Sequence, residues 1–151
     1  MIDAKQIKEL RQRTGISIAQ CKQALLDAEG NFDQAVELLK ERGAEVAGKK
    51  ADRELGAGSV SAYIHSNGNI GTLVELACET DFVSQNVEFK TLGEDLAMHI
   101  AATAPADVAE LLTSEYIKDP SLKIESLIQQ ASQKFGERIE ITRFARFELG
   151  V

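Results

Sequence analysis

Tryptophan is absent from this chain of 151 residues, and cysteine and proline occur only twice each. Cys21 and Cys78 have no second cysteine or histidine at ligand spacing, so neither a disulfide framework nor a zinc site is indicated. We interpret both as buried free thiols in a reducing compartment. No apolar run approaches the ~20 residues that a membrane-spanning helix needs, and Met1 leads into a polar helical pattern without signal-peptide features. A cytoplasmic location is therefore expected.

A surplus of positive charge is also missing. The chain carries 17 Lys and Arg residues against 24 Asp and Glu residues, which gives a net charge of -7. Binding along a nucleic acid requires Lys and Arg gathered on one face to neutralise phosphates, so direct nucleic-acid binding is not expected. The acidic balance favours a protein partner instead.

Signatures of catalysis are missing as well. Cys78, His65 and Asp81 supply the residue types of a nucleophilic triad, but no nucleophile elbow, glycine-rich phosphate loop or metal signature accompanies them. We therefore expect neither an enzyme nor a bound cofactor or metal, and the sequence directs attention to a binding function.

The first 43 residues have the apolar spacing of three short helices. Asp3 followed by Gln6 is a variant of the capping box, and Gly15 is expected to end the first helix. Two further helices follow, the last of which is expected to end at Gly43. Inward-facing residues are predicted at Ile7, Leu10, Cys21, Ala24, Leu25, Ala28, Phe32, Ala35, Leu38 and Leu39. So small a bundle buries little apolar area, and we expect it to be marginally stable.

Residues 44–56 keep a helix-compatible composition without an apolar stripe, and we interpret them as a helical linker. Beyond them the apolar period changes from 3.6 to 2, since Val60 and Ile64 alternate with polar residues. Asn67-Gly68 is a strong hairpin signal, and a return strand is predicted over residues 69–78.

The remainder of the chain predicts two amphipathic helices and a long final strand over residues 139–149. Residues 57–151 therefore form an α+β domain in this interpretation. Within the final strand, Phe147 is expected on the buried face, together with Ile139 and Ile141. Phe144 is expected among polar residues on the other face, and an exposed aromatic on a sheet commonly marks an interface.

The run Cys78-Glu79-Thr80-Asp81-Phe82-Val83 stands where a strand stops and a helix is about to begin. A lone phenylalanine is usually a core residue. Here, however, its neighbours are polar, so Phe82 is expected to leave a loop and not a periodic apolar face. Loops on a rigid scaffold often carry binding residues.

This run, together with Lys49-Lys50-Ala51, the Leu10–Gly15 segment and the Tyr63–Gly68 hairpin, resembles bacterial elongation factor Ts. The resemblance covers most of the chain, although the segment between Ala102 and Tyr116 is much shorter than is usual in that family. It implies a three-helix bundle of the ubiquitin-associated (UBA) type over residues 1–43, followed by a dimerisation and core domain over residues 57–151.

The resemblance also implies a function, which is guanine-nucleotide exchange on the translational GTPase elongation factor Tu. In the family the matching Asp and Phe enter the GTPase domain of the partner near the nucleotide and magnesium site, so Asp81 and Phe82 are expected to make the central contact. The residues expected to bind the partner are Thr80, Asp81, Phe82, Val83, Arg11, Thr14, Gly15 and His65.

Several of these residues also have a plainer interpretation. Thr14 and Gly15 could serve helix termination alone, and a histidine beside a turn, such as His65, is usually solvent-exposed. Relatives with one core half pair, so a homodimer is expected. The alternative function is a UBA-type adaptor that binds ubiquitin-like proteins or nascent chains through the bundle alone, and such an adaptor would have no need of the α+β domain.

Overall fold

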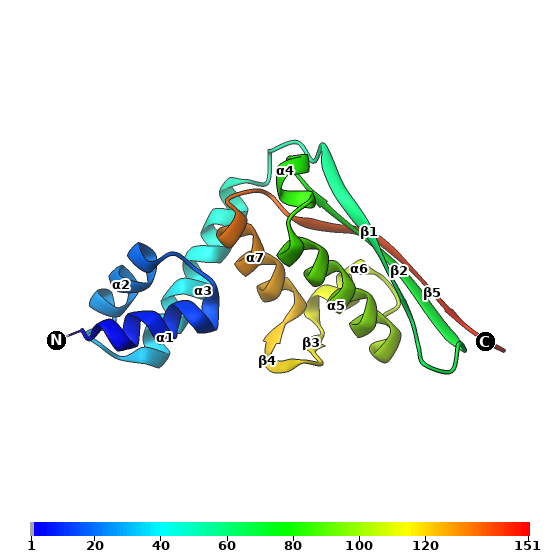
Figure 1. Cartoon of the computed structure of the whole chain (residues 1–151), viewed down its shortest axis with the longest axis horizontal. Coiled ribbons are helices and arrows are strands. Elements are labelled where there is room, and N and C mark those ends of the chain that lie inside the picture. Colours follow the sequence, from blue (N-terminus) through cyan, green and yellow to red (C-terminus); the bar gives the residue numbers. More distant parts are fainter. Residues whose placement is uncertain (1) are drawn as a thin grey trace. The chain divides into compact units, whose positions relative to one another are not determined.

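The computed structural model describes residues 2–151, except for the side chains of Val46 and Ala47, and its fold is α+β, as predicted. The chain forms two compact units (Figure 1). The first comprises the residues up to Asp52 together with residues 129–136, and the second comprises residues 53–128 and 137–151. Within residues 2–151, no helix has both the length and the apolar composition needed to cross a membrane.

The first unit contains three helices whose bounds are α1 (Ala4–Thr14), α2 (Ile18–Asp27) and α3 (Phe32–Lys49). Asp3 and Gln6 form the predicted capping box. The core consists of Leu10, Ile16, Cys21, Ala24, Leu25, Ala28, Ala35, Val36 and Leu39. Ile7, Phe32 and Leu38, which were also expected to face inward, are partly buried against this core.

The prediction that the third helix ends at Gly43 is wrong, because α3 continues to Lys49. One glycine inside a helix costs about 1 kcal/mol relative to alanine, which does not terminate a helix by itself. A Cβ atom on Gly43 would lie 3.0 Å from Oε1 of Gln133, in the half of α7 that belongs to the first unit. The missing side chain therefore allows this part of α7 to approach α3 closely.

The second unit is built on an antiparallel sheet of three strands in the order β1-β2-β5. Its strands are β1 (Ala57–Ile64), β2 (Ile70–Cys78) and β5 (Glu140–Glu148). The predicted hairpin at Asn67-Gly68 is confirmed. The N–H of Gly68 donates to the carbonyl oxygen of His65 at 2.7 Å, and Gly68 adopts a φ of +77°, which glycine tolerates without strain.

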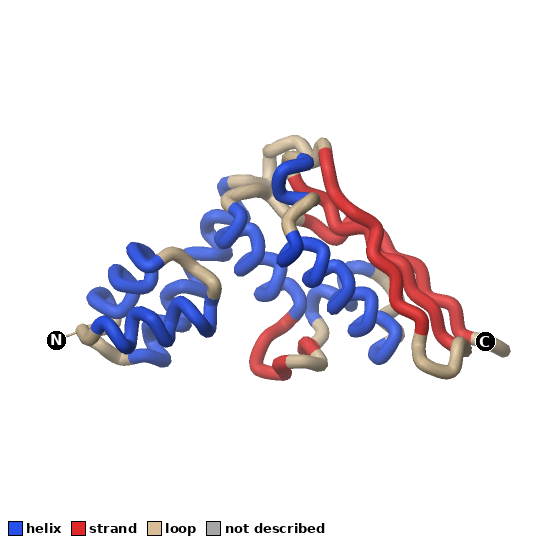
Figure 2. Tube along the Cα trace, in the orientation of Figure 1, coloured by secondary structure: helices blue, strands red, loops and turns tan. Residues whose placement is uncertain are grey.

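The helices of the second unit lie on one side of this sheet (Figure 2). α5 packs on β1 and β2. The elements between β2 and β5 are α4 (Asp81–Ser84), α5 (Val87–Thr103), α6 (Val108–Thr113), β3 (Glu115–Tyr116), β4 (Asp119–Lys123) and α7 (Ile124–Phe135). The helix predicted to stop at Gly136 is thus α7, whereas the hairpin of β3 and β4 had no clear signal in the sequence.

A β-bulge changes which residues of β5 face the helices. Leu76 pairs with Ile141, but the neighbouring Glu75 pairs with Arg143, so Thr142 is an extra residue in β5. Because successive side chains of a strand point to opposite faces, one extra residue inverts the alternation beyond it.

The predicted orientations of Phe144 and Phe147 are therefore wrong. Phe144 pairs with the buried Val74 and is itself partly buried. Arg146, two residues further along the same face, donates to the carbonyl oxygen of Ala101 in α5 at 3.0 and 3.2 Å. Phe147 lies on the opposite face, where it is 75% exposed.

The strand β1 turns its polar residues toward the helices. Ser59, Ser61 and Tyr63 are partly buried, whereas Val60 and Ile64 are 63% and 65% exposed. A Cβ atom on Gly93 of α5 would collide with the Ser61 hydroxyl. The glycine thus lets the backbone of α5 lie directly over the small side chains of β1.

His99 is a fully buried polar residue within α5. Its Nδ1 accepts the N–H of Ile117 at 3.3 Å, so Nε2 carries the hydrogen and donates to the Ser114 hydroxyl at 2.9 Å. Burial lowers the pKa of the imidazole, which is therefore neutral at neutral pH.

Candidate functional site

The run from Cys78 to Val83 forms the end of β2 and the one-turn helix α4, where a loop was predicted. Thr80 is the N-cap of α4, with extended backbone angles and a hydroxyl oxygen that accepts the N–H of Val83 at 3.4 Å. The side chain of Asn86 caps α5 directly afterwards by accepting the N–H of Glu88 at 2.8 Å. The segment is therefore a capped helical turn followed by a capped helix, and not a loop. The sequence does not reveal this turn, because four residues are too few to show a helical period.

The single turn of α4 separates its side chains into an outer and an inner set. Phe82 is 89% exposed and Asp81 is also exposed, whereas Val83 and Ser84 are 6% and 2% exposed. Val83 was expected among the partner-binding residues, but its buried side chain anchors the turn from the inside. The turn therefore presents a large aromatic and a carboxylate to solvent on an anchored base.

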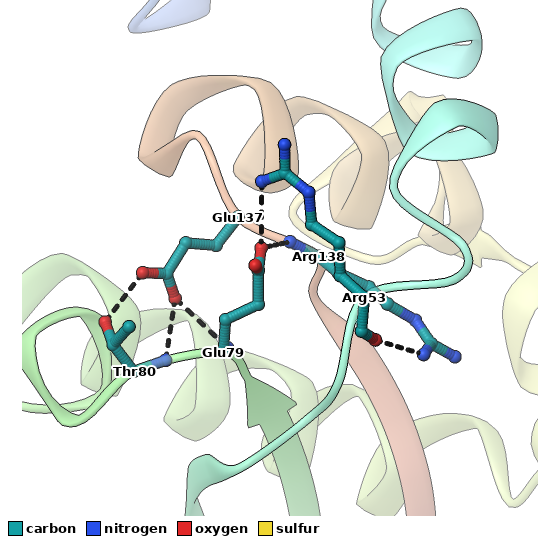
Figure 3. Close-up of polar contacts among 5 residues, drawn as sticks. All are labelled: Arg53, Glu79, Thr80, Glu137 and Arg138. Atoms are coloured by element: carbon teal, nitrogen blue, oxygen red, sulfur yellow. Dashed lines mark hydrogen bonds and ion pairs between the residues drawn. The ribbon is translucent and has the colours of Figure 1, made fainter.

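The connection between α7 and β5 holds the start of this turn (Figure 3). Oε1 of Glu137 accepts the N–H groups of Glu79 and Thr80 at 3.1 and 3.0 Å, and Oε2 accepts the Thr80 hydroxyl at 2.6 Å. In return, the Glu79 carboxylate accepts the N–H of Arg138 at 2.5 Å and lies 3.4 Å from the guanidinium of Arg53. We call the carboxylates of Glu79 and Glu137, together with the groups that donate hydrogen bonds to them, the carboxylate latch.

Cys78, the residue before Glu79, is a buried free thiol, as predicted. Its Sγ lies 3.3 Å from the carbonyl oxygen of Thr80, to which it donates. Burial raises the pKa of the Cys78 thiol, and the nearby carboxylates of Glu137 and Asp81 raise it further. Cys78 therefore remains a protonated packing residue.

The turn between β1 and β2, which contains His65, lies at the other end of the sheet from α4 (Figure 1). The eight residues of β1 separate the two regions, and a strand of that length spans about 26 Å. His65 is exposed, with Nδ1 3.2 Å from the Tyr63 hydroxyl. The structure therefore does not bring His65 together with Asp81, Phe82 or Cys78.

Arg11, Thr14 and Gly15 lie together in the first unit, at the end of α1. The Thr14 hydroxyl donates to the carbonyl oxygen of Leu10 at 2.7 Å. The N–H of Gly15 donates to the carbonyl oxygen of Arg11, also at 2.7 Å. Gly15 caps the C-terminal end of α1 with a φ of +72°, which lies in the left-handed region that glycine favours. These contacts shape the turn, and the Arg11 side chain remains exposed.

The face of the sheet opposite α5 is strongly apolar. Large side chains on or beside this face are 48% to 79% exposed, and they are Val60, Ile64, Leu73, Phe147 and Leu149. Five of its residues, Ala62, Ile64, Leu73, Phe147 and Leu149, also line a shallow groove. We call this surface the outer sheet face. A contiguous apolar surface of this kind is typical of an interaction site.

Two residues that hold the site, Glu137 and Arg138, are not evident from the sequence. They are adjacent residues of opposite charge after Gly136, in the connection before β5, and the groups of Glu79 and Thr80 that they bind lie 57 to 59 positions earlier in the chain. Across residues 2–151, no three His, Cys, Asp or Glu side chains gather in a way that could hold a metal ion.

Comparison with known proteins adds an independent finding. A family model described as Elongation factor TS matches residues 79–151, which include α4 and both carboxylates of the latch. The Elongation factor Ts of Fervidobacterium nodosum is 38% identical over 194 aligned positions, which cover 99% of this chain and 98% of the relative. That of Herpetosiphon aurantiacus is 37% identical over 194 positions, with the same coverage. The aligned positions outnumber the residues of this chain, so these relatives have residues without a counterpart here.

Proposed function

The chain belongs to the elongation factor Ts family, and from this membership we propose that it is a guanine-nucleotide exchange factor that promotes release of GDP from elongation factor Tu. In this proposal it makes and breaks no covalent bond, needs no cofactor and does not bind nucleic acid directly. It acts in the cytoplasm, where elongation takes place. Its proposed parts are a UBA-like bundle over residues 1–43, a helical linker over residues 44–56, into which α3 continues, and a core over residues 57–151.

The exposure of Phe82 carries this proposal. An aromatic side chain that is 89% exposed makes little contribution to the folding of its own chain, and Asp81 beside it is exposed as well. Exposed aromatics on an ordered support are typical anchors of protein interfaces. Asp81 and Phe82 are therefore proposed to enter the GTPase domain of the partner, with Thr80 and Val83 as their support.

One phenylalanine does not supply the required free energy. Burying it is worth about 1.5 to 3 kcal/mol, whereas weakening nucleotide binding by three to four decades requires roughly 4 to 5.5 kcal/mol. A second contact is therefore needed. We assign it to the end of α1, at Arg11, Thr14 and Gly15, with His65 on the hairpin as a further contact.

The mechanism follows from linkage between two ligands of one partner. If the factor binds nucleotide-free elongation factor Tu most tightly, it must weaken the nucleotide by the same free energy by which the nucleotide weakens the factor. Phe82 would bias the phosphate and magnesium site of the partner from outside, without touching the nucleotide. Rebinding of nucleotide then expels the factor.

The test is direct. Elongation factor Tu loaded with a fluorescent GDP analogue is mixed with excess unlabelled GDP, with and without this protein, and the release of the label is followed. The proposal expects a release rate that rises with the concentration of the factor and then saturates. A rate independent of the factor would refute it.

We also propose that the protein is a homodimer that pairs through the outer sheet face. Burial of this face against a second copy would remove Val60, Ile64, Leu73 and Phe147 from water, and a two-fold axis would join like surfaces. The Asp81-Phe82 tip lies at the end of β2 and would be present twice. Light scattering over a dilution series tests the pairing, because a mass that stays near 16.5 kDa at high concentration excludes it.

A further inference from the structure

The helix α4 needs support from outside itself. It has four residues, and a single isolated helical turn is unstable in water. Its later part is anchored by the buried Val83 and Ser84, but Thr80 and Asp81 at its start are exposed. Because Phe82 is 89% exposed, packing does not fix its position. The direction of Phe82 therefore depends on the buried residues that follow it and on polar contacts to the backbone just before it.

Glu137 supplies these contacts from a distant part of the chain. Its carboxylate accepts three donors from two successive residues, namely the N–H groups of Glu79 and Thr80 and the Thr80 hydroxyl. Hydrogen bonds to a carboxylate are stronger than bonds between neutral groups. Three of them fix both the position and the direction of the chain as it enters α4 (Figure 3).

The contact with the Thr80 hydroxyl also determines which hydrogen bond this hydroxyl donates and which it accepts. A hydroxyl group has one hydrogen to donate, and here it points to Glu137 at 2.6 Å. The oxygen lone pairs are thereby left to accept the N–H of Val83. Glu137 thus holds Thr80 in the orientation that an N-cap needs.

Glu137 is itself held in place by the other half of the carboxylate latch. The N–H of Arg138 donates to Glu79, and the Arg138 guanidinium donates to the Arg53 carbonyl oxygen at 2.7 Å and to the Glu140 carboxylate at 2.6 Å. The segment that ends β2 and the segment that precedes β5 therefore each use a glutamate carboxylate to accept a backbone N–H of the other. The end of β2 and the start of β5 are locked together at the base of the tip.

We propose that Glu137 is a positioning residue for nucleotide exchange, which holds Asp81 and Phe82 in their binding orientation before the partner arrives. The inference rests on the proposed function. An ordered tip has less conformational entropy to lose when it binds, so the partner is engaged at a lower concentration of the factor. Loss of the latch raises the concentration needed and leaves the maximal rate unchanged once the complex has formed.

The experiment measures GDP release from elongation factor Tu as a function of factor concentration for the wild type, Glu137→Ala and Glu137→Gln. We expect about a tenfold higher concentration for half-maximal release with Glu137→Ala. The effect of Glu137→Gln is smaller, since its amide oxygen still accepts the two N–H groups but its amide nitrogen cannot accept the Thr80 hydroxyl. Glu125→Gln, an exposed position on α7 with the same loss of charge, serves as the matched control and behaves as wild type.

Amide ¹⁵N relaxation at Phe82 provides a second measurement. The proposal expects faster motion of this amide in both Glu137 variants and unchanged relaxation in the sheet. If Glu137→Ala does not fold, Glu137→Gln decides by the same two measurements.

The possible outcomes separate the two proposals. A wild type without effect on GDP release overturns the proposed function, and the exchange role of Glu137 with it. A wild type that accelerates release while the Glu137 variants match it in half-maximal concentration overturns the positioning role alone. A fall in maximal rate in proportion to the unfolded fraction also overturns it, because Glu137 would then serve stability only.

Discussion

On the edge strand β1, the two faces of the three-stranded sheet differ in a sense opposite to the usual one. An antiparallel sheet with one solvated face normally keeps apolar residues inside and polar residues outside. On β1, however, Ser59 and Ser61 face α5, whereas Val60 and Ile64 point away from it and are more than half exposed. The hydrophobic pattern of β1 alone would therefore assign the wrong face to the interior.

The inner face is held by close approach of α5, and we propose that the outer face serves association. Gly93 lets α5 lie over the small serines of β1, and the buried apolar residues of this unit come from other elements, β2 and α5 among them. The outer sheet face keeps its large apolar side chains although the fold of one chain does not bury them. Such a pattern is costly in solution unless another surface covers it.

Two phenylalanines that stand seven positions apart show the same contrast. Phe89 in α5 is fully buried, whereas Phe82 in α4 is 89% exposed. Equal side chains should therefore contribute to different properties, namely stability for the inner one and binding for the outer one.

The largest loss of stability is expected for Phe89→Ala. Removal of a buried phenyl ring loses its transfer free energy and leaves a cavity, so the free energy of unfolding should fall by about 3 to 5 kcal/mol. Urea unfolding followed by circular dichroism measures this change. Phe82→Ala is the matched control, and equal losses for the two variants would contradict the division into inner and outer roles.

A smaller effect is expected from the titration of His99 on the inner side. Burial lowers the pKa of His99 in the folded chain, while the unfolded chain has the ordinary value of about 6.5. Between these values the unfolded state binds the additional proton, so stability falls as the pH decreases below about 6.5, by up to roughly 1.4 kcal/mol per pH unit. Above pH 6.5 this contribution is constant.

Urea unfolding at a series of pH values from 7.5 to roughly 5 measures the slope. The chain has two histidines, and the exposed His65 provides the control. His65→Gln should retain the slope, and His99→Gln should lose it whatever its stability at pH 7.5. A slope that survives in His99→Gln would place its origin elsewhere.

Much of this fold is predictable because its signals are local. The capping box at Asp3, the hairpin at Asn67-Gly68 and the stop of α7 at Gly136 each depend on residues within one or two turns of each other. The bulge at Thr142 and the continuation of α3 past Gly43 were missed. Each of them depends on a partner that is distant in sequence, as Thr142 and Glu75 are at a separation of 67.

The candidate site divides in the same way. Phe82 is recognisable from the sequence because polar neighbours surround it, and the resemblance to a family gave it a role. The burial of Val83 was missed because one helical turn has no period to detect. Glu137 was missed because a glutamate in a connection carries no sign of which backbone groups it will accept. The local sequence pattern therefore identifies the exposed residue proposed to bind, Phe82. Only the tertiary structure identifies Glu137, which supports it.

Phe147→Glu tests the outer sheet face. We expect the free energy of unfolding of the single chain to change by less than about 0.5 kcal/mol, since Phe147 is 75% exposed. The homodimer should dissociate, because two carboxylates would be brought into an apolar contact. Analytical ultracentrifugation measures the mass. Val87→Glu, which introduces the same charge at a site 77% exposed on α5, is the control and should keep the mass of the wild type. An unchanged mass for Phe147→Glu would rule out pairing through this face.

The smallest effect on stability and a strong effect on function are expected together for Phe82→Ala. The side chain is 89% exposed and the cap at Thr80 does not depend on it, so the unfolding midpoint should stay within error of the wild type. If Phe82 is buried in the partner, its removal forfeits about 1.5 to 3 kcal/mol, which lowers the second-order rate of GDP release roughly 10- to 150-fold. Ile117→Ala, at a site 40% exposed beyond β3, removes a comparable apolar side chain and should leave release unchanged. A variant that lowers the unfolding midpoint would make Phe82 a structural residue, and one that exchanges nucleotide at the normal rate would remove it from the interface.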